Sequence, residues 1–220
     1  LSIATSHLAM FQNPLDSQDP SSYTSTMKKQ CLINAQREVF EETLLQKRQI
    51  CIFGIIDREM ADRVIKEVLF LNAASEREPI KLYLSSQGGG TTASLDIFDI
   101  IKSLTSSVIG VVVAQANSNA SLVLQACSKR LILPHSTIKL HNLRVTIQRS
   151  FLEMSENILK QQEEIFRRQV EETRGRQEIV YDILASRAKV SRSEIKKFCC
   201  ESREFSASEA MAVGLVDAIA

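Results

Sequence analysis

Apolar positions follow two different spacings along the chain from residue 50 onward. Short apolar runs rich in β-branched residues are typical of buried strands, and they occupy 50–55, 80–86, 107–114, 130–134 and 137–141. Apolar residues spaced three or four positions apart predict helices, and such segments occupy 58–74, 91–104 and 118–127. In the first of them, one face gathers Met60, Val64, Val68 and Leu71.

The predicted strands and helices alternate with short connections. This order indicates parallel strands joined by crossover helices, and hence an α/β fold. Sheets of this kind bind their ligands at the carboxyl ends of the strands. Three features fall at such ends: the glycines at 88–90 after the second strand, Ser118 after the third, and His141 at the end of the fifth.

Residues 151–187 form a long segment that consists almost entirely of helix formers. Its many charged residues predict a solvated face with ion pairs four positions apart. An apolar stripe also runs along it, through Phe151, Ile158, Ile165, Val180 and Leu184. A long amphipathic helix of this kind is also what an assembly contact looks like.

The two ends of the chain carry different signals. Residues 1–26 contain nine Ser or Thr, two Pro and no Lys or Arg, so they match neither a secretory signal with a positive start nor an Arg-rich transit peptide. We interpret them as a flexible arm or a processing remnant in front of one domain at 27–220. Near the other end, Ser206 and Glu209 form an S-x-x-E capping box, and Gly214 predicts the end of that helix.

Composition narrows the classes of function. With 44% hydrophobic and 24% charged residues, the 220-residue chain is ordinary for a globular protein. Its net charge of +1 gives no electrostatic reason to expect nucleic acid or a membrane surface, and no apolar run approaches the roughly 20 residues of a membrane span. An odd number of cysteines without CxxC spacing predicts buried reduced thiols in a reducing compartment and no metal site. These cysteines are Cys31, Cys51, Cys127, Cys199 and Cys200.

The segment around Ser118 has two interpretations. Ser and Asn before a helix are common N-caps, but a strand-to-helix elbow can also expose a nucleophilic serine. The second interpretation needs a base, because a serine hydroxyl alone is a weak nucleophile. Of the three histidines, His7 lies in the arm and His135 in a turn, which leaves His141. Histidine titrates near neutral pH and can therefore accept the serine proton and return it.

The glycine triplet is a candidate oxyanion site. Gly88 and Gly89 let the backbone approach a ligand closely and point N–H groups at a developing negative charge. The simpler alternative is a tight turn without further function. Phosphate binding is not predicted, because the chain has no GxxxxGK[ST] pattern.

Three longer blocks of sequence resemble one known family. They read LFLNAASEREPIKLYLSSQGGGTTASLDIFDII, VVVAQANSNASLVLQACSKRLILPHSTIKLH and EFSASEAMAVGLVD. In this order they are similar to the proteolytic subunit of the Clp protease family, over roughly residues 34–220. The resemblance implies a ClpP/crotonase-like fold, with a ββα spiral core and a long protruding handle helix in a region at about 144–200.

The resemblance also implies an activity and partners. The chain would be a serine endopeptidase subunit that cleaves unfolded polypeptides inside a barrel of two stacked heptameric rings. Its partners would be copies of itself or paralogous subunits and a hexameric AAA+ unfoldase. The unfoldase would use the ATP, so this chain would need no cofactor. The implied compartment is the bacterial cytoplasm or an organelle matrix or stroma.

By position, the resemblance assigns roles to four residues. Ser118 matches the nucleophile of the family, and His141 matches its histidine. The oxyanion donors would be the backbone N–H groups of Gly89 and Asn119.

The chain also departs from the family pattern. The family aspartate lies seven residues before the Glu of the S-A-x-E-A block, and that position holds Ser202. The adjacent Glu201 could substitute for it if the backbone shifts, but a neighbouring residue on an extended segment faces the other way. Other blocks differ too, with Gln87 and Leu143 in place of prolines and Asn119 in place of a methionine.

These departures leave two further functions open. One is a weakly active or inactive structural subunit of a mixed Clp ring, which the loss of the aspartate favours and the presence of Ser118 and His141 opposes. The other is a crotonase-type acyl-CoA enzyme, which shares the fold and an oxyanion site but has no use for a Ser–His pair.

Overall fold

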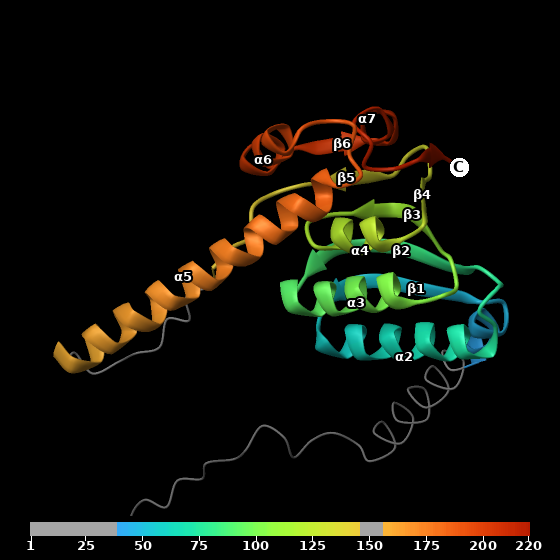
Figure 1. The fold of residues 1–220 in the computed structure, drawn as a ribbon, viewed down its shortest axis with the longest axis horizontal. Coiled ribbons are helices and arrows are strands. Elements are labelled where there is room, and N and C mark those ends of the chain that lie inside the picture. Colours follow the sequence, from blue (N-terminus) through green and yellow to red (C-terminus); the bar gives the residue numbers. More distant parts are fainter. Residues whose placement is uncertain (1–38, 146–155) are drawn as a thin grey trace, which may run out of the picture. The chain divides into compact units, whose positions relative to one another are not determined.

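The structure is a computed structural model that describes residues 39–145 and 156–220 (Figure 1). Contacts divide the chain into two units, Leu1–Thr43 and Leu44–Ala220, and the elements below belong to the second. The expected boundary between arm and domain at residue 26 lies outside the described residues. The same holds for His7, Cys31 and Phe151 and for the side chain of Ile158.

A parallel sheet forms the centre of this unit (Figure 1). Its strands are β1 (Gln49–Ile56), β2 (Ile80–Gly89), β3 (Val108–Ala116), β4 (Lys129–Ile132) and β7 (Ala218–Ile219). They lie in the order β1-β2-β3-β4-β7, and each neighbouring pair is parallel. Beside them, β5 (Thr137–Lys139) pairs in parallel with β3, and β6 (Glu204–Ser206) pairs antiparallel with β5.

Helices connect and flank these strands. They are α2 (Arg58–Ala74), α3 (Thr91–Ser103), α4 (Ala120–Ala126), α5 (Glu156–Ala185), α6 (Arg192–Cys200) and α7 (Ala207–Ala212). The predicted capping box is present, because Ser206 caps α7 and exchanges hydrogen bonds with Glu209. Gly214 follows α7 with a φ of +80°, which suits glycine at a helix end. The α/β fold class predicted from the sequence is confirmed.

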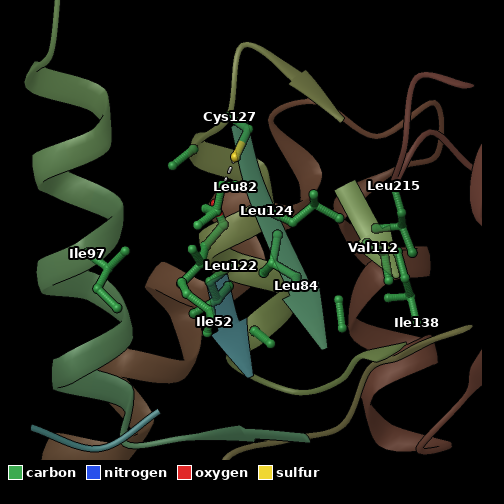
Figure 2. Packing of buried hydrophobic residues seen from close by; sticks show 14 of the residues in the cluster. Ile52, Leu82, Leu84, Ile97, Val112, Leu122, Leu124, Cys127, Ile138 and Leu215 are labelled. Carbon is green, nitrogen blue, oxygen red and sulfur yellow. Dashed lines mark hydrogen bonds between the residues drawn. The ribbon is translucent and has the colours of Figure 1, made fainter. Parts of the chain in front are cut away.

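The core lies between the sheet and its helices (Figure 2). Every second residue of β2 is buried, as expected for a strand with one face on the core. Helix α4 approaches β3 closely at Gly110, where an added Cβ would lie 2.8 Å from the sulfur of Cys127 and 2.9 Å from Leu124 Cδ1. A larger residue at this position would push away the helix that begins at the predicted site.

The predicted face of α2 is confirmed with one exception. Val64, Val68 and Leu71 are buried together with Ala61, whereas Met60 is only half-buried. Asp57 caps the start of the helix by accepting a hydrogen bond from the Met60 backbone N–H at 2.8 Å.

Two predicted boundaries were wrong near the strand ends. The second strand was predicted to end at residue 86, but β2 continues through Gly89, because Gly88 and Gly89 pair with Ile55 and Ile56 of β1. Only Gly90 remains as a connection, and it precedes α3 directly. Strand β5 ends at Lys139, so that His141 follows the strand by two residues instead of ending it.

Helix α5 is the long helix that the sequence predicted in the handle region. It has 30 residues, and its apolar stripe divides into two parts. Val180 and Leu184 are buried in the core, whereas Ile165 keeps 44% of its surface exposed. Near its C-terminal end, α5 is tied to α6 by ion pairs of Arg192 with Glu178 at 2.7 Å and with Asp182 at 2.5 Å.

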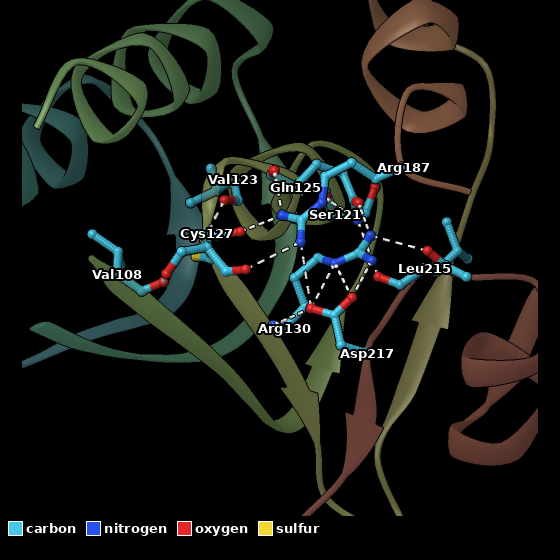
Figure 3. Close-up of polar contacts among 11 residues, drawn as sticks. Val108, Ser121, Val123, Gln125, Cys127, Arg130, Arg187, Leu215 and Asp217 are labelled. Atoms are coloured by element: carbon cyan, nitrogen blue, oxygen red, sulfur yellow. Dashed lines mark hydrogen bonds and ion pairs between the residues drawn. The ribbon is translucent and has the colours of Figure 1, made fainter. Parts of the chain in front are cut away.

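A buried arginine joins α4, β4 and the C-terminal segment (Figure 3). Arg130 is only 3% exposed. Its guanidinium donates hydrogen bonds to Gln125 and to the Gly214 carbonyl at 2.9 Å and pairs with Asp217. The Asp217 carboxylate also accepts from the Arg130 backbone N–H at 2.7 Å. This charge is therefore fully paired, as buried charges must be.

Cys127, Cys199 and Cys200 are free thiols in the described part of the chain. Cys127 and Cys199 are buried, but Cys51 is only half-buried and Cys200 is exposed. The expectation of buried thiols was therefore wrong for Cys200. Among the described helices, none combines the length and the apolar character needed to cross a membrane.

Candidate active site

Ser118 sits at a sharp elbow between β3 and α4. Its φ is +54°, a left-handed conformation that few residues other than glycine adopt. The backbone N–H of Ser118 donates to the Lys139 carbonyl at 2.7 Å, and its carbonyl accepts from Ser121 Oγ at 2.6 Å. Helix α4 is capped at Asn119, which makes no side-chain cap bond. The N-cap interpretation of Ser118 was therefore wrong, and the backbone has the geometry of an elbow.

Gly88 packs directly beneath this elbow. Its φ is +95°, and an added Cβ would lie 2.7 Å from the Asn117 carbonyl oxygen and 2.8 Å from Ser118 Cβ. Both contacts are shorter than real Cβ atoms show, so only glycine fits. The Gly88 N–H donates to Ser86 Oγ at 3.0 Å. The end of β2 is thus held against the residue that the sequence predicted as nucleophile.

The side chain of Asn119 links the two residues predicted as oxyanion donors, Asn119 itself and Gly89. Its side chain is buried, and its Nδ2 donates to the Gly89 carbonyl at 2.7 Å and to Thr91 Oγ1 at 3.1 Å. Among the described residues, no hydrogen bond uses the backbone N–H of Asn119, and this nitrogen lies 3.1 Å from the position that a Gly88 Cβ would occupy. An unpaired N–H at this point is available to a ligand. The sequence analysis assigned a role to the backbone N–H of Asn119 but did not predict these contacts of its side chain.

His141 approaches the elbow through β5. Strand β5 pairs with β3 between Thr137 and Gln115. The hydrogen bond from the Ser118 N–H to the Lys139 carbonyl extends this contact, and Lys139 lies two residues before His141. The histidine is half-buried, and its Nδ1 lies 2.7 Å from the Asn142 carbonyl oxygen. Within the described chain no hydrogen bond joins Ser118 to His141. Such catalytic bonds are often long without substrate and tighten when it binds.

Position 202 carries no acid. The antiparallel pairing of β5 with β6 continues to a hydrogen bond from the Leu140 N–H to the Arg203 carbonyl at 2.9 Å. Extended by one residue, this register would bring Ser202 opposite His141, although β6 itself begins at Glu204. Ser202 has a φ of +52° and is exposed. Among the described residues, no carboxylate forms a hydrogen bond with His141.

Glu201 does not occupy an extended segment as the sequence suggested. It is the C-cap of α6, with φ −81° and ψ −4°. Its carboxylate lies 3.9 Å from Lys197 Nζ, one turn back on the same helix. The structure therefore gives Glu201 a partner on its own helix.

Two side chains of α5 hold the segment that follows His141. Tyr181 Oη donates to Asn142 Oδ1 at 2.7 Å, and Gln177 Oε1 accepts from the Leu143 N–H at 2.6 Å. The remaining polar atom of the Asn142 side chain, Nδ2, donates to the sulfur of Cys200 at 3.5 Å. The sequence analysis missed both α5 residues, because they lie more than thirty positions from the segment they contact.

Comparison with known protein families agrees with the resemblance found in the sequence. The family model described as Clp protease matches residues 34–220. The chain belongs to the Clp protease family. Clp proteases are in general serine peptidases that assemble as oligomeric rings and work with an unfoldase. The match includes the elbow, His141 and position 202, so these features belong to the Clp-type part of the chain.

Metal binding finds no support in the described residues. In 39–145 and 156–220, no group of three or more His, Cys, Asp or Glu side chains is placed to hold an ion. The site offers a serine on a strained elbow, an unpaired N–H beside it and a histidine two residues after the adjoining strand. These groups suit acyl transfer.

Proposed function

We propose that this chain is a serine endopeptidase subunit of an ATP-dependent Clp-type protease, which cleaves unfolded polypeptides inside a chamber of stacked rings. The observation that carries the proposal is the elbow at Ser118. A left-handed serine with an unpaired N–H next to it is expected where a hydroxyl must be presented to a substrate carbonyl.

In the proposed reaction, Ser118 Oγ attacks the carbonyl carbon of the scissile peptide bond while His141 takes the hydroxyl proton on Nε2. The backbone N–H groups of Asn119 and Gly89 donate to the oxyanion that forms. The tetrahedral species then breaks its C–N bond, and His141 returns the proton to the leaving amine. Water repeats the sequence on the acyl-enzyme and releases the carboxylic acid together with free Ser118.

The proposed partners follow from the family. They are copies of this chain or paralogous subunits in heptameric rings, and a hexameric AAA+ unfoldase that uses the ATP, so that this chain needs no cofactor of its own. We place this activity in protein quality control, in the bacterial cytoplasm or in an organelle matrix or stroma.

A second candidate is a structural subunit of a mixed ring with little or no activity. The serine at position 202 favours it, because a triad histidine without an anionic partner loses much of its rate. The strain at Ser118 opposes it, since a silent subunit has no need for a left-handed serine.

Labelling with a fluorophosphonate separates the two candidates. In the assembled protein, the probe forms an Oγ–P bond with an activated serine and loses fluoride, and mass spectrometry locates the adduct. We expect the adduct at Ser118, its loss in Ser118→Ala, and its retention in Ser103→Ala, which removes an exposed serine at the end of α3. If protein confirmed to be in rings takes up no label, catalysis by this subunit is excluded and the structural role stands.

A further inference from the structure

We propose that the carbonyl of Asn142 takes the place of the missing carboxylate as the group that orients His141, and that Gln177 and Tyr181 are the positioning residues that hold this carbonyl. The inference rests on the proposed peptidase function. It concerns how a chain with Ser202 at the third position can still present a usable base.

The contact between His141 and Asn142 selects one tautomer. A carbonyl oxygen accepts hydrogen bonds but never donates them. With Nδ1 at 2.7 Å from the Asn142 oxygen, the ring proton belongs on Nδ1, and Nε2 keeps its lone pair for the serine proton. This is the tautomer that a triad aspartate enforces in other serine peptidases.

The carbonyl needs support from elsewhere, because residues 140–145 have no regular secondary structure. That support comes from α5. The Leu143 N–H belongs to the same peptide group as the Asn142 carbonyl, and Gln177 accepts a hydrogen bond from it at 2.6 Å. A bond to the N–H polarises the peptide group and strengthens its oxygen as an acceptor.

Tyr181 supports the same peptide group indirectly, by binding the side chain of Asn142. Its hydroxyl donates to Asn142 Oδ1 at 2.7 Å. Gln177 and Tyr181 are four residues apart and therefore share one face of α5. Burial raises the pKa of Tyr181 to about 12, so its hydroxyl remains a donor throughout the working range of pH.

The environment of Gln177 is consistent with a specific role for its oxygen. Its side-chain nitrogen is buried and has no hydrogen-bond partner among the described residues. A buried unpaired N–H opposes folding. The nitrogen of Gln177 therefore lowers the stability of the fold, while its oxygen holds the Asn142–Leu143 peptide.

The test is a double-mutant cycle on the rate of fluorophosphonate labelling at Ser118 in the assembled protein. Tyr181→Phe removes only the hydroxyl, and we expect labelling to slow about fivefold. Ser202→Asp supplies a carboxylate opposite His141 and makes the carbonyl dispensable. In that background we expect Tyr181→Phe to change the rate less than about twofold. The control is Tyr83→Phe on β2, whose hydroxyl makes no hydrogen bond in the described part of the chain.

Equal losses in the two backgrounds would mean that Tyr181 acts only on folding, and they would overturn the inference. Unchanged labelling in Tyr181→Phe would do the same. Thermal unfolding of each variant identifies a rate that falls because the protein is less folded.

A second measurement does not depend on catalysis. Nitrogen NMR of histidine-labelled Ser118→Ala protein reports which ring nitrogen of His141 carries the proton. We expect the Nδ1–H tautomer to dominate and its share to fall when Tyr181→Phe is added. A dominant Nε2–H tautomer would overturn the inference. Absence of labelling in every variant, including Ser202→Asp, would instead overturn the proposed peptidase function.

Discussion

Ser118 and Ser202 share a left-handed backbone, with φ values of +54° and +52°, but the surroundings of the two residues differ. Ser118 is held on both sides by hydrogen bonds to Lys139 and Ser121. Ser202 is exposed, and its backbone closes the turn after α6 by donating to the Cys199 carbonyl at 3.2 Å. Asp and Asn tolerate this conformation better than most residues. An acid at position 202 would therefore fit the existing backbone.

This fit leads to a prediction for Ser202→Asp. A carboxylate that accepts from the Nδ1–H of His141 stabilises the imidazolium that forms as Ser118 Oγ attacks the probe. We therefore expect Ser202→Asp to raise the labelling rate about tenfold. The measurement is the labelling rate of the assembled protein, compared between variant and parent under the same conditions.

The matched control for this prediction is Ser202→Asn, which has the same shape and tolerance for positive φ but no charge. It should leave the labelling rate within about twofold of the parent chain, because a neutral amide does not stabilise the imidazolium as a carboxylate does. A rise of the same size with Asn would show that the effect does not come from the charge.

At the scale of elements, the position of α4 depends on the buried ion pair behind it. Arg130 on β4 reaches Gln125 on α4 and Asp217 ahead of β7. Burial alone would raise the pKa of Asp217, but hydrogen bonds and charge from Arg130 hold it below its ordinary value. The stabilisation from this pair is therefore complete above about pH 4 and is lost as the pH falls through the lower folded value.

Asp217→Asn should destabilise the fold by about 2–3 kcal/mol at pH 7, because it leaves the Arg130 charge buried without its anion. The expected loss of stability is smaller than for breaking a fully buried ion pair, since the Asp217 side chain is 33% exposed. The free energy of unfolding, measured with urea at pH 7 and at pH 3, should differ less between variant and parent at the lower pH.

Asp182→Asn is the control for this stability measurement. Its ion pair with Arg192 is exposed and should contribute less than about 1 kcal/mol at either pH. If Asp217→Asn costs no more than Asp182→Asn, the network around Arg130 does not carry the stability assigned to it.

Across the whole molecule, the described thiols range from fully buried to exposed. Burial raises the pKa of Cys127 and of Cys199 to about 12 in each case. Thiolates react and thiols do not, so these two residues combine poor access with poor reactivity. Cys51 is half-buried and Cys200 is exposed.

We therefore expect iodoacetamide at pH 8 to modify Cys200 and to leave Cys127 and Cys199 unmodified while the protein is folded. Peptide mapping by mass spectrometry measures the three rates. In urea the rates should become similar. Early modification of Cys127 in folded protein would contradict the packing of α4 against β3.

The sequence predicted what local pattern controls and missed what distant contacts control. The spacing of Val64, Val68 and Leu71 was enough to place α2, because a helix buries residues on a single face. Gly88 and Gly89 have little strand preference of their own and become strand only through β1. The contacts of Gln177 and Tyr181 with the segment after His141 join residues far apart in the chain, and no local pattern reports them.

The left-handed backbone at Ser118 also has a consequence for how this chain can change over generations. A glycine at that position would lose the hydroxyl and relax the backbone, with a gain of about 1 kcal/mol in stability. Replacing Ser118 by glycine would therefore abolish the reaction and at the same time raise the free energy of unfolding. Folding stability would not select against such a mutation. Selection for the reaction is what would keep a serine at this position.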